Sequence, residues 1–202
     1  MKRILLTSFL LTQSSFAFAA DIENLSFYVG AGVSYVGPGS LTFDGYDLEG
    51  TPFGQFIGVD LNRGQTFYGL EYNRLQPHCD YYNNYGGPCG QNNQQGIGEN
   101  DRAYSYMDLA DIKLRVGRNF EGSKAYFIAG GSIGRYDFDE TTGPSGEQYY
   151  GASGYLIGAG FEYELFKNFS AGGEFIARSI RIEGEADRSQ LSTFQVRTLY
   201  RF

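Results

Sequence analysis

The chain has 202 residues, a formal net charge of −7, 29 glycines, 17% aromatic residues and no tryptophan. This length fits one domain, and the acidic balance argues against nucleic-acid binding, which needs a basic surface. No run of about eighteen apolar residues occurs, which excludes a transmembrane helix, so any membrane span must be built from closed β-strands.

The N-terminus has the layout of a secretory signal peptide. Lys2 and Arg3 precede a short apolar stretch, and the sequence Ala-Phe-Ala at 17–19 then places small residues at alternate positions. A charged start, a short apolar core and an Ala-x-Ala end are the three parts of such a peptide. We therefore predict a signal peptide over 1–19 and a mature domain over 20–202, whose net charge is near −9 because Lys2 and Arg3 are lost.

Eight segments of the mature chain alternate between apolar residues and small or polar ones, with the period of two that is typical of β-strands. In chain order they are 27–35, 53–61, 66–75, 103–118, 124–138, 155–165, 170–182 and 194–202. An even number of strands suits closure into an antiparallel membrane barrel. The predicted fold is therefore all-β: an eight-stranded antiparallel up-and-down transmembrane β-barrel.

One face of each predicted strand is apolar, and the other carries glycine, serine and charged residues. We expect the apolar face to contact lipid and the other face to line the lumen, where acidic and basic side chains pair. The predicted lumen charges are Asp111, Lys113, Arg115, Glu162, Glu164, Glu174, Arg178, Arg197 and Arg201. In the segment 124–138 the pattern does not decide which residues face lipid, because Phe127 and Ile128 are adjacent and both suit the lipid side. A soluble lipocalin-like barrel is the competing interpretation, but it would place the glycine-rich face in water, where glycine offers no solvating group.

Connections between the predicted strands alternate between long and short. The long ones are 37–52, 76–102 and 139–152, the short ones are 62–65, 119–123 and 166–169, and 183–190 is intermediate. Outer-membrane-type barrels have short periplasmic turns and longer outer loops. The long connections are also acidic, whereas Arg63 and Lys167 lie in short ones. We therefore expect both termini in the periplasm and acidic loops at the cell surface.

Cys79 and Cys89 lie in the longest connection, which is rich in asparagine, glycine and tyrosine. An exported chain with two cysteines is expected to form a disulfide, worth about 2.5 to 3 kcal/mol in the chain-entropy model. This bond would rigidify a surface hairpin rather than support the fold. The alternatives are free thiols and a metal site at His78, Cys79 and Asp80, but no second cluster completes the coordination. We expect no metal or cofactor.

The terminal strand carries the most specific family signal. Val196, Thr198, Tyr200 and Phe202 resemble the C-terminal assembly signal of the OmpA-like and OmpX-like small outer-membrane β-barrels, a family that includes adhesion and opacity barrels. The resemblance covers about 25–202 and does not include the peptidoglycan-binding domain of full-length OmpA-type proteins. It implies location in the outer membrane of a Gram-negative bacterium and recognition by the barrel assembly machinery.

A closed eight-stranded interior is normally filled by side chains, so we expect function in the loops. The first hypothesis is a structural and surface-interaction protein, adhesin- or opacity-like, whose loops contact lipopolysaccharide, host surfaces or other cells. The alternative is a narrow, cation-preferring channel, favoured by an acidic mouth and a charged lumen. A lipid-modifying enzyme ranks last, because His78 is the only histidine and no spacing ties a serine or aspartate to it. Because closure leaves no free strand edge, we expect a monomer.

Overall fold

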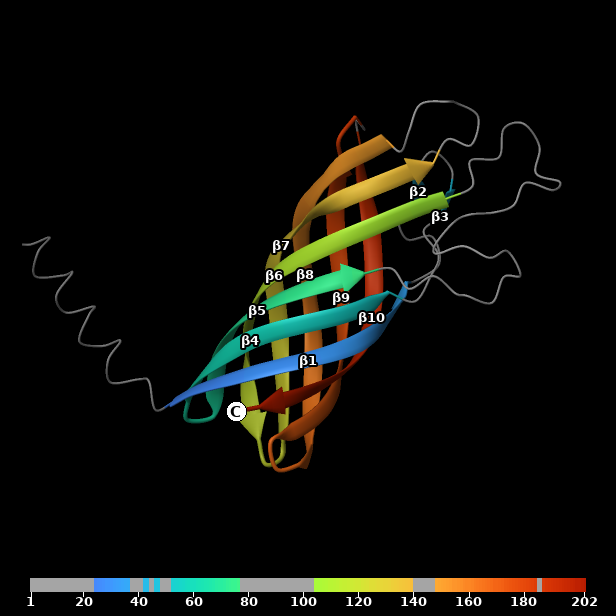
Figure 1. The fold of residues 1–202 in the computed structure, drawn as a ribbon. Helices are drawn as coiled ribbons and strands as arrows, with labels where there is room; N and C mark the ends of the chain where they lie inside the picture. The colour runs from blue at the N-terminus through green and yellow to red at the C-terminus, as the bar shows by residue number, and fades with distance from the viewer. Residues whose placement is uncertain are drawn as a thin grey trace, which may run out of the picture.

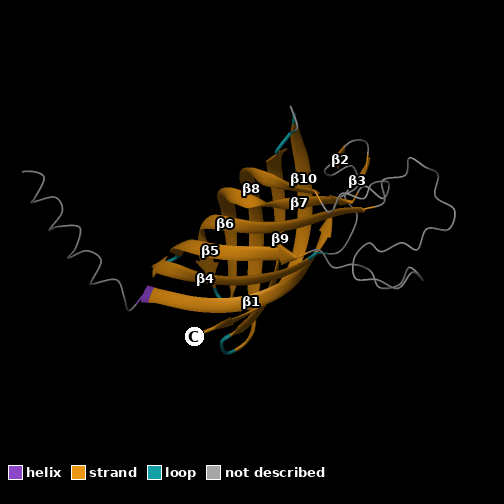
Figure 2. Cartoon of the chain, turned by 45° about the horizontal axis from the view of Figure 1, so that its top comes forward, coloured by secondary structure: helices purple, strands orange, loops and turns teal. Residues whose placement is uncertain are grey.

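The computed structural model describes residues 24–36, 42–43, 46–47, 52–76, 104–139, 148–184 and 187–202. Eight long antiparallel strands close into one barrel (Figure 1), which confirms the predicted fold. These strands are β1 (Leu25–Val36), β4 (Phe53–Arg63), β5 (Thr66–Gln76), β6 (Tyr104–Phe120), β7 (Ser123–Asp139), β8 (Gln148–Phe166), β9 (Phe169–Ile182) and β10 (Arg188–Arg201). Figure 2 shows that strands make up nearly all of the described chain. Within the described ranges no helix has the length and apolar character to cross a bilayer.

Each barrel strand pairs with its neighbours in chain order, and β1 closes the barrel by pairing with both β4 and β10. At this seam Val33 is the register partner of Val196. Closure removes the unpaired strand edges that would otherwise be exposed in lipid. A further short pair, β2 (Thr42–Phe43) with β3 (Tyr46–Asp47), lies inside the predicted connection 37–52. Two-residue strands are too short to show a period in sequence.

The three short connections are tighter than the sequence predicts, with only two residues between paired strand ends. They are 64–65, 121–122 and 167–168. Gly64 and Gly122 have positive φ angles of 62° and 70°, and Asn168 has one of 70°. Glycine adopts this left-handed region without strain and asparagine tolerates it best among the other residues. We call this end of the barrel the turn end and the opposite one the loop end.

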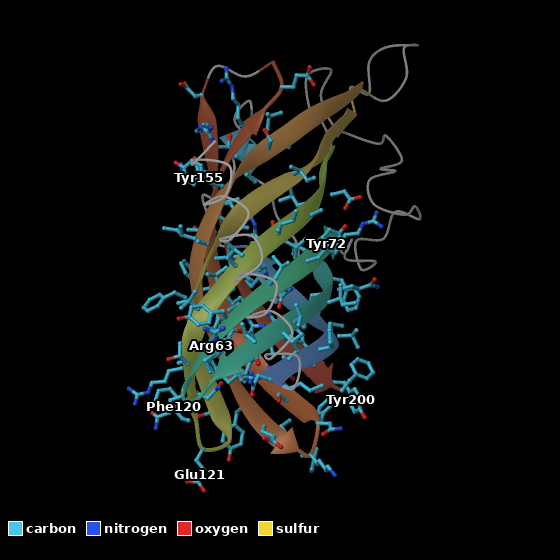
Figure 3. All side chains as sticks on the ribbon, turned by 90° about the vertical axis from the view of Figure 1, so that its left-hand side faces the viewer. Arg63, Tyr72, Phe120, Glu121, Tyr155 and Tyr200 are labelled. Atoms are coloured by element: carbon cyan, nitrogen blue, oxygen red, sulfur yellow. The ribbon has the colours of Figure 1, made fainter. Side chains whose placement is uncertain are left out.

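The outer wall carries a broad apolar band. Ile57, Leu114 and Ile157 have exposed fractions of 57%, 58% and 62% at positions where a soluble barrel would be polar. Figure 3 shows Tyr72 and Tyr155 nearer the loop end and Phe120 and Tyr200 nearer the turn end. Two levels of aromatic side chains around an aliphatic band are typical of a barrel that spans a bilayer.

The inner face settles the one strand whose facing the sequence leaves open. On β7, Phe127 is 77% exposed on the outer wall and Ile128 is 3% exposed inside. The interior also contains two apolar clusters that the sequence analysis does not predict. One contains Phe67, Tyr126, Ile128, Leu156 and Ile176, and the other contains Tyr28, Phe56 and Leu199. These side chains fill the space between the charged groups.

Inward-facing glycines make room for the largest of these side chains. A Cβ atom at Gly58 would lie 2.3 Å from the ring and the hydroxyl oxygen of Tyr28. At Gly160 it would lie 2.6 Å from the ring of Tyr126. Each tyrosine can therefore extend over the adjacent strand only because its register partner there has no side chain. Their hydroxyl groups lie among the charges described below.

Candidate functional site

The lumen contains a network of charged side chains that project from inward-facing positions of seven strands. Five carboxylates and six cationic side chains form its ion pairs. The carboxylates are Asp60, Glu71, Asp111, Glu162 and Glu174, and the cations are Lys113, Arg115, Lys124, Arg178, Arg197 and Arg201. The strand pleat places all of them on one face, because alternate residues point to the same side of a sheet.

Glu71 and Glu174 form the centre of the network. Glu71 accepts hydrogen bonds from the Lys113 Nζ at 3.0 Å, from the Arg197 Nη2 at 2.5 Å and from the Tyr28 hydroxyl at 3.0 Å. Glu174 accepts from the same lysine at 2.7 Å, from the Tyr126 hydroxyl at 2.9 Å and from Arg197. These carboxylates and both cations are 0% exposed. Buried charges are tolerated only when they are paired and hydrogen-bonded in this way.

A second group of ion pairs lies toward the turn end. Asp60 accepts hydrogen bonds from the Lys124 Nζ and from Arg201, both at 2.9 Å. Glu162 accepts from the Arg115 Nη2 at 2.5 Å and also from Arg201. Arg115 further lies 3.5 Å from a Glu71 oxygen, which joins this group to the central one. The turn end of the lumen is therefore crossed by cations and carboxylates from opposite sides of the barrel.

A third group lies in the lumen toward the loop end, separate from the other two. Asp111 accepts two hydrogen bonds from Arg178, at 2.6 and 3.3 Å, and one from the Ser132 hydroxyl at 2.6 Å. The same guanidinium donates to the Thr193 hydroxyl at 2.7 Å. Two parallel bonds to one carboxylate hold an arginine in a fixed orientation.

Aromatic rings cover the faces of the buried guanidinium groups. The central carbon of Arg197 lies 3.8 Å from the Phe56 ring centre, and that of Arg115 lies 4.0 Å from the Tyr126 ring centre. A ring face attracts a cation and excludes water from one side of it. Together with the ion pairs, these contacts fill the lumen cross-section with side chains. The ion pairs and ring contacts therefore hold the buried side chains of the lumen in fixed positions.

A sequence model described as the outer membrane protein beta-barrel domain matches residues 4–202. The chain belongs to this family. It is a barrel of the Gram-negative outer membrane, in contact with the lipids of that membrane. A search of curated protein sequences found no significant match.

Several solved outer membrane barrels share the fold. Ail, the attachment invasion locus protein of Yersinia pestis, aligns with a TM-score of 0.56 and 15% identity, covering 88% of this chain and 97% of that one. Neisserial surface protein A (NspA) aligns with a TM-score of 0.52 and 12% identity, covering 89% and 97%. The N-terminal β-barrel domain of Pseudomonas aeruginosa OprF gives 0.51 and 13%, covering 88% and 97%. At these identities the likeness concerns the fold.

The structure of this outer membrane barrel brings together most of the charges that the sequence analysis assigns to the lumen. Seven are buried within the network: Asp111, Lys113, Arg115, Glu162, Glu174, Arg178 and Arg197. Arg201 is 16% exposed in its side chain and bonds inward to Asp60 and Glu162. Glu164 differs, because it is exposed at the turn end, where it lines a hollow of about 400 Å³ together with Lys124 and Arg201. Strand β8 runs past the level at which the lumen is enclosed.

Three charged members of the network are absent from the predicted lumen charges, namely Asp60, Glu71 and Lys124. Glu71 lies between the outward-facing Leu70 and Tyr72, so the alternation within the segment 66–75 already indicates an inward carboxylate. Asp60 follows Gly54 and Phe56 on the inward face of 53–61 in the same way. The signal was present, and it could have been found by applying the period of two to every predicted strand.

Other predicted residues lie on the outer wall or outside the described part of the barrel. Val196, Tyr200 and Phe202 are 52%, 45% and 74% exposed on the lipid side, and Thr198 is exposed beside them. Cys79, Cys89 and His78 lie outside the described residues, as does the predicted signal peptide 1–19. Within the described ranges, no group of three or more histidine, cysteine, aspartate or glutamate residues could hold a metal ion.

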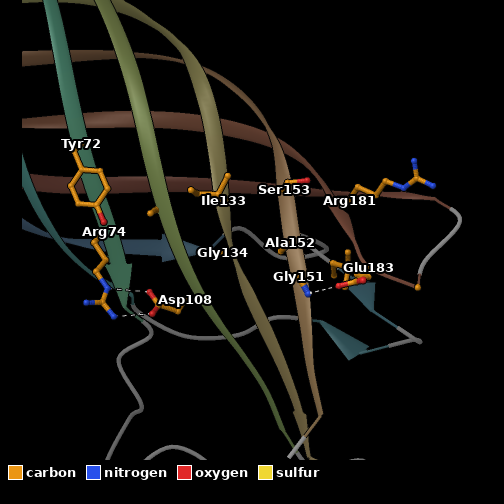
Figure 4. Close-up of a pocket in the computed structure, with 13 residues that line it drawn as sticks. Tyr72, Arg74, Asp108, Ile133, Gly134, Gly151, Ala152, Ser153, Arg181 and Glu183 are labelled. Carbon is orange, nitrogen blue, oxygen red and sulfur yellow. Dashed lines mark hydrogen bonds and ion pairs between the residues drawn. The ribbon is translucent and has the colours of Figure 1, made fainter.

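The loop end of the barrel carries a hollow of about 1230 Å³, lined by residues of β5 to β9 (Figure 4). An ion pair between the Arg74 Nη2 and the Asp108 Oδ2, at 2.9 Å, lies at one side of it. Arg181, Ser153 and Glu183 lie at the other side. The hollow is thus bordered by charged groups at the level where the strands leave the apolar band.

Proposed function

We propose that this outer membrane barrel is a surface-interaction protein, adhesin- or opacity-like, whose barrel anchors binding loops. The observation that carries the proposal is the filled lumen. From Asp60 at the turn end to Arg178 at the loop end, buried ion pairs and aromatic rings occupy the described interior. A barrel interior of this kind leaves the outer surface as the place for recognition.

The comparisons support a role of this kind without an enzymatic step. Ail is named as an attachment and invasion protein and NspA as a surface protein, and both have this barrel fold. Ail was also solved in complex with a heparin analogue, sucrose octasulfate. For the present chain a different partner is favoured, because its connections 37–52, 77–103 and 140–147 contain eight acidic residues and one basic residue. Such loops would attract a basic surface and repel a sulfated polymer.

The protein can be displayed on a Gram-negative strain that does not adhere by itself. Deleting residues 79–89 is expected to reduce the attachment of this strain to the level measured without the protein. The reason is that this segment contributes tyrosine side chains, which favour contact surfaces. Attachment to cultured epithelial cells is the measurement, and a heat-modifiability gel checks that the barrel is folded. A matched control replaces 140–147 with eight glycine and serine residues. Unchanged attachment after the deletion would contradict the proposal.

The narrow cation-preferring channel is the competing function, and conductance separates it from the proposal. We expect no reproducible conductance steps in planar bilayers, because the pairs at Glu71, Glu174 and Asp111 cross the lumen. The network also contains one more cation than carboxylates, which opposes cation selectivity. Stable, cation-selective steps from the purified protein would favour the channel instead.

The family membership also supports two proposals on assembly. We propose that Val196, Thr198, Tyr200 and Phe202 form the signal that the barrel assembly machinery recognises, because they lie exposed on one face of the last strand. We further propose that the protein is a monomer, since β1 pairs with β10 and leaves no barrel strand unpaired.

A further inference from the structure

Two arginines face each other directly on the outer wall near the loop end. Arg181 of β9 and Arg188 of β10 are register partners, and both side chains are exposed. They share the outward face of their strands with Phe175 and Phe194. Like charges directly opposite one another in an antiparallel pair destabilise the sheet. An anion between the two guanidinium groups would convert this repulsion into attraction.

Contacts of Arg188 direct its guanidinium group toward the apolar band. Its Nη1 donates to the backbone oxygen of Ser179 at 3.2 Å, and its central carbon lies 5.2 Å from the ring centre of Tyr155. Tyr155 is 57% exposed on the outer wall. The guanidinium group therefore lies back along the wall, on the membrane side of its own Cα atom.

Arg181 offers a second guanidinium group at the same place. Among the residues that the structure describes, its side chain forms neither an ion pair nor a hydrogen bond. Its register partner on β8 is Ser153, which is exposed and carries a hydroxyl group. Arg181 and Ser153 both line the hollow of about 1230 Å³ at the loop end (Figure 4). Donors on two neighbouring strands thus border an open space.

Two carboxylates lie near this pair without forming an ion pair with it. Glu183 lies two residues beyond Arg181, and its Oε2 accepts a hydrogen bond from the Gly151 backbone N–H at 3.3 Å. Asp187 precedes Arg188 in sequence. Within the described part of the chain, neither carboxylate forms an ion pair with Arg181 or Arg188. Among the described residues, both guanidinium groups therefore lie beyond ion-pair distance of any carboxylate, although Glu183 and Asp187 are close in sequence.

The height of the pair on the barrel places it at the lipid headgroups. Arg181 lies about twelve residues along β9 from Phe169 at the turn end, which corresponds to an axial rise of roughly 30 Å for a strand tilted by about 40°. The apolar band of such barrels is about 25 Å tall. On the outward face of β10, Phe194 and Val196 give way to Gln190 and then Arg188 in the direction of the loop end.

We propose that Arg181 and Arg188, together with Ser153 and Tyr155, bind a phosphate group of a phosphorylated glycolipid in the outer leaflet. Guanidinium groups form bidentate, charge-assisted hydrogen bonds with phosphate. The site opens sideways onto the membrane boundary, so a phosphate that is anchored by acyl chains reaches it at the right height. The adjoining hollow gives room for the sugar of the headgroup. This inference is independent of what the surface loops bind.

Binding of diphosphoryl lipid A tests the proposal. The purified protein in a neutral detergent is titrated with this lipid, and the bound fraction is followed by native mass spectrometry. The variant R181Q/R188Q is expected to bind about tenfold more weakly, because it loses the charge-assisted bonds to phosphate. The matched control R63Q/K167Q removes two positive charges at the turn end and is expected to bind like the wild type. A heat-modifiability gel confirms that both variants are folded.

Two further probes identify the part of the lipid that is bound. Dephosphorylated lipid A is expected to bind the wild type no better than it binds R181Q/R188Q. Inorganic phosphate at the same concentration is expected to leave the protein unoccupied, since it lacks the acyl anchor. Equal binding of diphosphoryl lipid A to wild type and R181Q/R188Q would overturn the site. If the protein bound inorganic phosphate as strongly as it binds the lipid, the assignment of the site to a membrane lipid would be overturned.

Discussion

Glu71→Gln is expected to lower the free energy of unfolding by about 3 to 5 kcal/mol, the cost of removing one partner of a buried ion pair. The Glu71 carboxylate is 0% exposed and accepts hydrogen bonds from Lys113, Arg197 and Tyr28. Glutamine keeps the shape of the side chain but leaves two buried cations with less compensation. The excess of positive charge in the network would rise from one to two.

Glu164→Gln is the matched control for this substitution. It makes the same chemical change on the inward side of a strand, but at an exposed position of the turn end. Charge neutralisation at an exposed site changes stability by less than about 1 kcal/mol. Denaturant unfolding of both variants in lipid vesicles, followed by tyrosine fluorescence, gives the comparison. Equal stability of the two variants would show that the central network does not hold the barrel together.

Ile157→Arg is expected to destabilise the folded barrel in lipid by about 2 to 4 kcal/mol, the cost of a cationic side chain near the bilayer midplane. Ile157 is 62% exposed on the outer wall of β8, between Ala129 and Ala177 on the neighbouring strands. Those alanines offer no polar partner for the guanidinium group. The penalty therefore comes from the surrounding lipid rather than from lost contacts inside the protein.

Leu165→Arg places the same charge on the same strand, where β8 reaches the turn end. Leu165 is 47% exposed and lies beside Lys167 of the turn. Near the interface an arginine costs only about 0 to 1 kcal/mol. Unfolding in vesicles and heat modifiability measure both variants. If the two arginines destabilised the protein equally, the assignment of the outer wall to lipid would be wrong.

Much of the fold is predictable from sequence because the strand pleat is a local property. The eight predicted strands all occur, and the segment 53–61 corresponds closely to Phe53–Arg63. Strand ends are less predictable: β8 begins at Gln148 rather than near 155, within the predicted connection 139–152. Beyond the apolar band both faces of a strand meet water, so the alternation fades there although the backbone pairing continues.

The facing of one strand needed the assembled barrel. Phe127 and Ile128 are both large and apolar, so no local pattern distinguishes the lipid side from the lumen. The structure decides it through register: Phe127 aligns with the outward Ala159, and Ile128 packs with Leu156 and Ile176 inside. In a closed sheet the register fixes which alternate residues of each strand point inward, because a slip of one residue would move every side chain to the opposite face.

For the other seven strands, the amino-acid pattern alone indicates which side chains face lipid and which face the lumen, because alternation along a pleated strand requires no knowledge of its neighbours. Which charges meet depends on the assembled barrel. Arg197 and Glu71 are 126 residues apart in the chain, yet they bond in the lumen once β10 closes against β1. Such pairs depend on the stagger of all the strands around the barrel, which no single segment encodes.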